Sequence, residues 1–104
     1  MLFFVDEDTV RSMQGQYPRY AGNFPVWAQQ ANGMLQICVW ARLRETGIGA
    51  NIQHYNPVID DAVKNLLGLP PSFALIAQMS FGGIVAEPDP KPKEDIDARV
   101  KVFI

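Results

Sequence analysis

The sequence predicts one small α+β domain with few strands. The chain has 104 residues, of which 48% are hydrophobic, enough for one packed core. A continuous apolar run at residues 2–5 and a mostly apolar run at residues 73–79 are typical of buried strands. Between them lies a long proline-free stretch, residues 26–46, whose apolar residues recur with helical spacing. Alternating helices and strands of this kind indicate an α+β class.

The first half predicts a strand and two helices. Residues 2–5 form the strand, and Asp6 or Asp8 caps a helix over residues 9–16. That helix ends before Pro18, because a residue that precedes proline avoids the helical region. Pro25 then suits the first turn of the long helix. We expect an inward-facing stripe at i, i+3 and i+4 spacing that consists of Trp27, Ala31, Met34, Leu35, Cys38 and Ala41.

Further apolar residues widen this stripe, so we expect a second subunit to cover part of the long helix. Gly47 is a natural end for it. A polar loop over residues 47–57 follows, and Asn56 and Pro57 start a shorter helix. A strand is predicted at residues 72–81, an extended arm at 87–97, a turn at 96–98 and a last strand at 100–104.

The total charge and the cysteine content exclude several classes of protein. The formal net charge is −2 and the sequence pI about 5.2, which disfavours a nucleic-acid binder. The lone Cys38, expected to fill core space, cannot form an internal disulfide, so a reducing, cytoplasmic setting fits. The apolar start at residues 1–5 is too short for a signal segment or a membrane span. We therefore expect no nucleic-acid or membrane partner.

Few residues could carry chemistry. His54 is the only histidine, and no metal cluster or nucleophilic triad can be built around it, so we assign no catalytic or metal-binding residue. It is either a loop histidine with local hydrogen bonds or a ligand neighbour. Arg99 and Lys101 would share one face of a strand, where they either grip a phosphate or are simply solvated. Gly47 and Gly49 are better explained as a helix stop than as a dinucleotide fingerprint.

Four segments together resemble a known family. Residues 23–27, 49–57, 75–82 and 99–103 are similar to the C-terminal half of the nitroreductase-family FMN flavoproteins. The similarity includes the sequence Ile-Gln-His-Tyr-Asn-Pro at residues 52–57, which resembles the LQHYNP-type loop of the branch named for fatty-acid repression. Residues 1–104 are accordingly interpreted as the C-terminal portion of a single nitroreductase-like domain.

This resemblance implies a partial nitroreductase fold. A long core helix would pack on a small, mainly antiparallel sheet, completed by dimerisation or by a missing N-terminal half. The implied function is an FMN-dependent oxidoreductase that transfers a hydride from NAD(P)H through the flavin to nitroaromatic or quinone-like acceptors, as a homodimer. The alternative is a non-catalytic dimerising or regulatory fragment of such a flavoprotein.

The resemblance also implies a set of cofactor-binding residues. The loop after the long helix would run along the flavin ring, with Ile52 in apolar contact and polar groups of its neighbours near the ring nitrogen and carbonyls. A basic pair near the C-terminus would bind the FMN phosphate. The expected cofactor-binding residues are Asn51, Ile52, Gln53, His54, Arg99 and Lys101.

Overall fold

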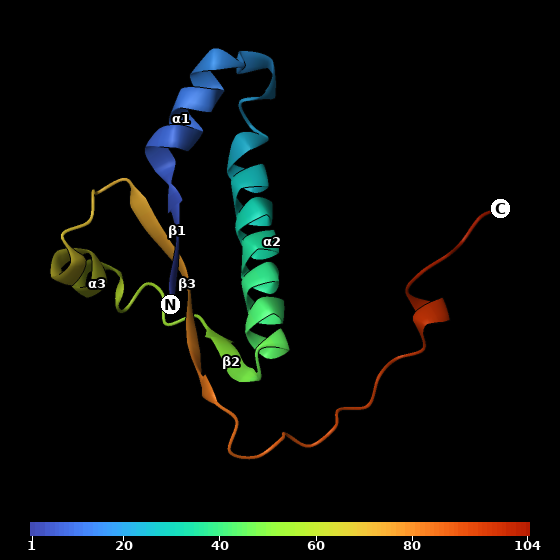
Figure 1. Ribbon diagram of the computed structural model, residues 1–104. Coiled ribbons are helices and arrows are strands. Elements are labelled where there is room, and N and C mark those ends of the chain that lie inside the picture. The colour runs from blue at the N-terminus through green and yellow to red at the C-terminus, as the bar shows by residue number, and fades with distance from the viewer.

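The protein, described here by a computed structural model of residues 1–104, consists of one antiparallel sheet, one long helix across it and an extended C-terminal segment (Figure 1). The strand order is β1-β3-β2. The predicted α+β class is confirmed. In chain order the elements are β1 (Leu2–Asp6), α1 (Glu7–Gln16), the 3₁₀ turn η1 (Pro18–Tyr20), α2 (Phe24–Glu45), β2 (Ile48–Gln53), α3 (Asp60–Leu67), β3 (Phe73–Gly83) and the 3₁₀ turn η2 (Ile96–Ala98).

The sheet is organised around β3. Both apolar runs form strands as predicted, and β1 pairs antiparallel with the first half of β3. The second half of β3 pairs antiparallel with β2, so that Ile52 lies opposite Met79 and Gln53 opposite Gln78. Every residue of β3 from 73 to 79 is buried or half-buried, which explains why this stretch is mostly apolar without strict alternation, whereas residues 80–83 are exposed.

The predicted helix signals in the first half are also confirmed. Asp6 caps α1, since its carboxylate accepts hydrogen bonds from the Asp8 N–H at 3.1 Å and the Thr9 hydroxyl at 2.7 Å. Pro25 lies in the first turn of α2. Gly47 follows the end of α2 with φ at 78°, a left-handed backbone that glycine adopts without strain. The turn at Ile96–Ala98 is present as η2.

The polar loop predicted at residues 47–57 is wrong over its first part. Residues Ile48–Gln53 form β2, because β3 extends far enough to supply a ladder partner for each of them. The shorter helix begins at Asp60 and not beside Pro57. The Asn56 side chain donates to Asp60 Oδ1 and to the Leu75 carbonyl, each at 2.9 Å, and so holds residues 56–59 as a turn beside β3.

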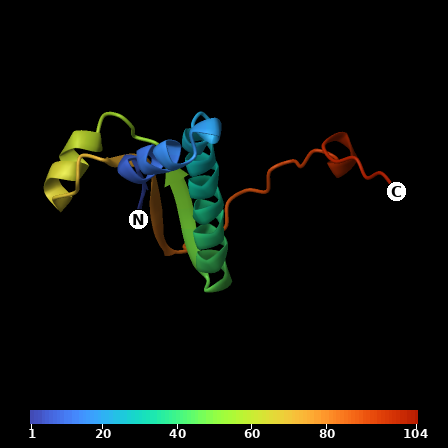
Figure 2. The same cartoon turned by 90° about the horizontal axis from the view of Figure 1, so that it is seen from above.

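The strand predicted at residues 100–104 is absent as well. Residues 84–104, called the arm below, leave the end of β3. Residues 84–88 still lie beside α2 and β2, and the rest of the arm runs apart from the body of the chain (Figures 1 and 2). A strand forms only where a neighbouring strand can accept its hydrogen bonds, and the arm has no such neighbour. In both views α3 and the end of the arm lie on opposite sides of the sheet and α2.

The predicted inner face of α2 is wrong. Met34, Leu35 and Cys38 are exposed, whereas Asn32 and Gln36 are the buried residues of the helix. The sheet-facing contacts come from Val39, Trp40 and Leu43, which pack against Phe3, Ala77 and Met79. The stripe expected to fill the core is therefore a surface feature, and Cys38 is a surface thiol.

Two side-chain amides explain why α2 packs on the sheet with a different face from the predicted one. Asn32 Nδ2 donates to the Phe4 carbonyl at 3.0 Å, next to an irregularity in the pairing of β1 between Phe3 and Phe4. Gln36 Nε2 donates to Asn32 Oδ1 at 2.6 Å inside the interface. A buried strand carbonyl without a donor is costly, so the amides face the sheet at the irregular point.

The core is thin. Only 7 of the 104 residues are buried, and the apolar ones are Phe3, Leu75, Ala77 and Met79. Many large apolar side chains on α2, α3 and the arm remain exposed, including Leu35 at 54%, Leu66 at 84% and Phe103 at 93%. None of the helices is long and apolar enough to cross a membrane. Exposed apolar surface on this scale is unusual for a single domain and is typical of surfaces that contact other protein.

Candidate functional site

The strand β2 divides its side chains between the two faces of the sheet. Ala50 and Ile52 pack against the buried cluster below α2. Because strand side chains alternate, Asn51 and Gln53 lie on the opposite face, where their cross-strand partners are Ser80 and Gln78. Gln53 Nε2 donates to Asn51 Oδ1. This polar surface at the end of β2 is the candidate site.

The pairing of the two amides leaves hydrogen-bonding capacity free. Asn51 Nδ2 makes no hydrogen bond within the chain and remains a donor, while Gln53 Oε1 remains an acceptor. His54 follows directly, is exposed and makes no hydrogen bond within the chain, so its interpretation as a locally bonded loop histidine is not supported. Donors and acceptors therefore stand side by side at the edge of the sheet, free for an external molecule.

Sequence reasoning missed Gln78. This β3 residue is only 8% exposed, and both polar atoms of its side chain are hydrogen-bonded: Oε1 accepts from the Tyr55 N–H at 2.8 Å, and Nε2 donates to Asn56 Oδ1 at 3.1 Å. The signal was present, since Gln78 is a polar residue inside the apolar run of residues 73–79. A buried amide in such a run needs partners, and here the partners are the residues that follow β2.

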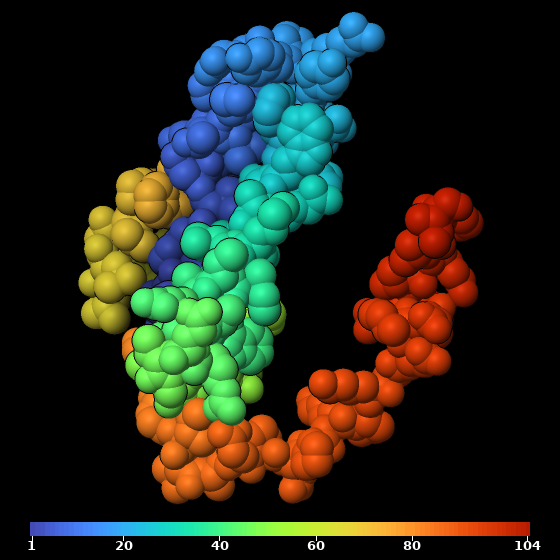
Figure 3. All heavy atoms as spheres, turned by 45° about the vertical axis from the view of Figure 1, so that its right-hand side comes forward, coloured from blue at the N-terminus to red at the C-terminus, as the bar shows by residue number.

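The structure does not bring Arg99 and Lys101 to the polar end of β2. Both lie on the arm, which stands apart from the body in Figures 1 and 3. Arg99 Nε lies 3.9 Å from Glu94 Oε2, and Lys101 Nζ donates to the Asp97 carbonyl at 3.0 Å. Both cations are exposed, and exposed ion pairs of this kind are weak. Each cation therefore interacts only weakly with its own chain.

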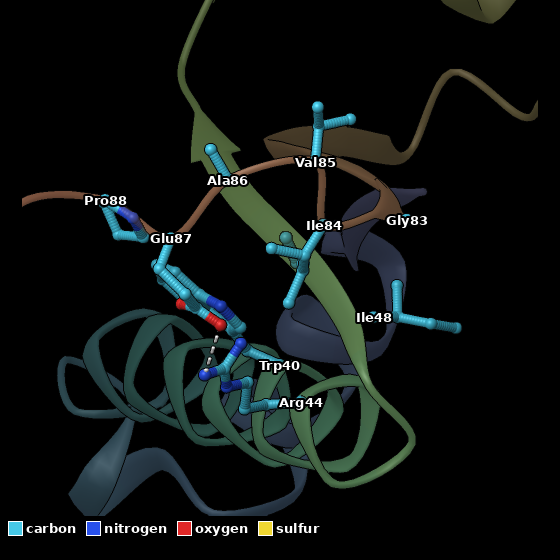
Figure 4. A pocket seen from close by; sticks show the side chains of 11 residues that line it. Trp40, Arg44, Ile48, Gly83, Ile84, Val85, Ala86, Glu87 and Pro88 are labelled. Atoms are coloured by element: carbon cyan, nitrogen blue, oxygen red, sulfur yellow. Dashed lines mark hydrogen bonds and ion pairs between the residues drawn. The ribbon is translucent and has the colours of Figure 1, made fainter.

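The arm leaves the sheet over a hollow of about 620 Å³ between α2 and β2 (Figure 4). Arg44 Nη2 lies 3.0 Å from Glu87 Oε1, beside Trp40. Ile84 approaches β2 so closely that a Cβ on Gly49 would lie 3.0 Å from its Cγ1, so only glycine fits there without displacement. The two charged residues that line the hollow, Arg44 and Glu87, therefore pair with each other.

Several known proteins are similar to this chain in sequence and in structure. The chain is 33% identical to Saccharomyces cerevisiae HBN1 over 99 residues, which are 93% of this chain and 50% of that protein. It is 34% identical to the S. cerevisiae nitroreductase FRM2 over 91 residues, 88% of this chain and 46% of that protein. It superposes on nitroreductase CinD from Lactococcus lactis with a TM-score of 0.95 and 45% identity, over 98% of this chain and 54% of CinD.

The chain belongs to the nitroreductase family. The resemblance noted in the sequence and the partial nitroreductase fold are thereby confirmed. A solved nitroreductase from S. cerevisiae also matches, with a TM-score of 0.71 and 33% identity over 81% of this chain and 46% of that one. No protein-family model matches the sequence.

This nitroreductase-family chain spans about half the length of the relatives that it matches. CinD has been solved in complex with 4-nitrophenol, with nicotinic acid and with chloramphenicol. Those complexes describe CinD. For the present chain, homology to nitroreductases is the finding on which a functional proposal can be built.

Proposed function

We propose that this chain forms part of an FMN-dependent oxidoreductase that passes a hydride from NAD(P)H to nitroaromatic or quinone-like acceptors. The observation that carries the proposal is the free polar surface at the end of β2, on a chain that is 45% identical to a nitroreductase with a TM-score of 0.95. When bound, FMN supplies the redox chemistry, and the protein holds the ring and tunes it.

The donor set at the end of β2 suits a flavin ring. An isoalloxazine carries carbonyl oxygens and a ring N–H at its polar end, which need donors and an acceptor in turn. Asn51 Nδ2 and Gln53 Oε1 provide one of each, and the exposed His54 adds a further polar group. Ile52 packs its side chain toward the core, so in this proposal it acts through its backbone and by anchoring the strand under its polar neighbours.

We assign the FMN phosphate to Arg99 and Lys101, and the assembly to a homodimer. The separation of the arm from its own body supports a role for these cations in a second copy. The second copy would cover the open face of α2, which consists of Trp27, Met34, Leu35, Ile37 and Cys38. Arg and Lys fit this role because the guanidinium binds phosphate through two parallel hydrogen bonds and the ammonium adds a point charge.

The phosphate assignment is tested by replacing both Arg99 and Lys101 with Ala and measuring the FMN dissociation constant by flavin fluorescence. Each charged hydrogen bond is worth about 1.5–3 kcal/mol, so the loss of both contacts should weaken binding by at least about 100-fold. The matched control replaces Lys91 and Lys93, two exposed arm lysines, and removes the same charge. Equal weakening in the control would show that only overall charge matters.

A non-catalytic dimerising or regulatory role is the second candidate. It is favoured by the exposed apolar face of α2, which suits association with another chain without a cofactor. The two functions are separated by mixing the purified protein with FMN, NADH or NADPH and a nitroaromatic acceptor. Oxidation of the reduced nicotinamide above the rate with free FMN supports the enzyme. Dimerisation with no such rate supports the non-catalytic role.

A further inference from the structure

Gln78 and Asn56 link three parts of the fold through their side-chain amides. Gln78 lies on the central strand, Asn56 in the turn after β2, and the Asn56 amide continues to Asp60 at the start of α3. Its Nδ2 also donates to the Leu75 carbonyl of β3 at 2.9 Å. Every polar atom of Gln78 is engaged, and none of the buried side-chain polar atoms in the chain lacks a partner.

This amide clasp is what holds the segment after β2. The β2–β3 ladder ends at the pair Gln53 and Gln78, so residues 54 and 55 have no strand partner. The first backbone N–H beyond the ladder that finds an acceptor is that of Tyr55, and its acceptor is Gln78 Oε1 at 2.8 Å. The His54 and Tyr55 side chains are both exposed, so side-chain packing does not fix this segment.

We infer that Gln78 and Asn56 are positioning residues, which set flavin affinity by holding His54 and Tyr55 at the polar end of β2 without contacting the flavin themselves. This inference rests on the proposed function. Gln53 and Gln78 are cross-strand partners, so the clasp lies directly beside the proposed ring-binding amides. Loss of the clasp releases the segment at the point where the strand ends, and the position of His54 relative to Gln53 becomes variable.

The test uses Gln78→Met, which keeps the length of the side chain and its burial but removes both hydrogen bonds of the Gln78 amide. Asn56→Ala removes the partner of the Gln78 amide at a half-buried position, and it replaces the first variant if that one does not fold. Gln78→Glu restores one bond, because a carboxylate still accepts from the Tyr55 N–H. Gln29→Met is the matched control, since the Gln29 side chain is exposed and makes no hydrogen bond within the chain.

Two readouts are measured on the folded variants: hydrogen exchange of the Tyr55 amide without FMN, and the FMN dissociation constant together with the flavin absorption spectrum. We expect Gln78→Met to accelerate Tyr55 exchange and to weaken FMN binding, each by about fivefold to tenfold, as loss of a neutral hydrogen bond predicts. Gln78→Glu should recover part of both effects, and the control should match the wild type.

The outcomes separate the inference from the proposed function. Unchanged Tyr55 exchange in both clasp variants would overturn the inference. So would accelerated exchange with an unaltered FMN dissociation constant and spectrum, because the segment would then be held without consequence for the cofactor. A wild-type chain that binds no FMN would overturn the proposed function, while accelerated exchange in the variants would still support the clasp as the element that holds the segment.

Discussion

The open face of α2 allows a quantitative test of self-association. Leu35, near the middle of this face, is 54% exposed in the single chain. Complete burial of a leucine side chain is worth about 1.5–3 kcal/mol, so the half that is still exposed is worth about 1–1.5 kcal/mol in an interface. A twofold dimer uses the same surface twice, which gives about 2–3 kcal/mol for the pair.

The perturbation is Leu35→Glu, which removes this apolar contact and places a carboxylate in the interface. The apolar term alone predicts a dimer dissociation constant roughly 30-fold to 150-fold higher, and desolvation of the charge adds to it. Sedimentation velocity over a range of concentrations measures the effect, with circular dichroism to verify the helix content. The matched control is Asn65→Asp, which adds one negative charge at an exposed position of α3.

Three results are decisive. Dissociation of Leu35→Glu with an intact circular dichroism spectrum supports the open face of α2 as the dimer surface. A variant that associates as strongly as the wild type refutes it, because a buried carboxylate cannot be accommodated without cost. Equal weakening by Asn65→Asp would show that the added charge acts through the overall field and not through this face.

Two further predictions concern stability. Met79 is 1% exposed at the centre of the core, so Met79→Ala should lower the free energy of unfolding by about 2–5 kcal/mol in urea denaturation, whereas Ala at the exposed Ser80 should have little effect. Hydrogen bonds from Thr9 and then Ser72 lower the pKa of Asp6 below its ordinary value of 3.8. The ionised Asp6 carboxylate therefore stabilises the folded state above pH 3.8, and this contribution disappears as the pH falls through the lower folded-state pKa. Thermal unfolding should show the difference between wild type and Asp6→Ala narrowing only below about pH 4, and a constant difference would contradict this.

The sequence by itself determined the family and those local features that depend on single residues and their neighbours. Asp6, Pro25 and Gly47 carry their own signals, because a cap, a fixed φ and a left-handed backbone depend on the residue and its immediate neighbours. The apolar run at residues 73–79 likewise predicts a central strand wherever it lies. The similarity of residues 49–57 and three further segments to nitroreductases is visible in the sequence alone.

Only the tertiary structure decided which faces and which pairings are used. Residues 48–53 read as a loop, and became a strand because β3 extends beside them, whereas residues 100–104 alternate correctly and remain unpaired. The buried face of α2 is set by Asn32, whose amide meets the Phe4 carbonyl 28 positions earlier in the chain. Gln78 acquired its role in the same way, through partners 22 and 23 residues distant. Hydrogen-bond partners this far apart leave no periodic trace in a sequence, and only their meeting in space reveals them.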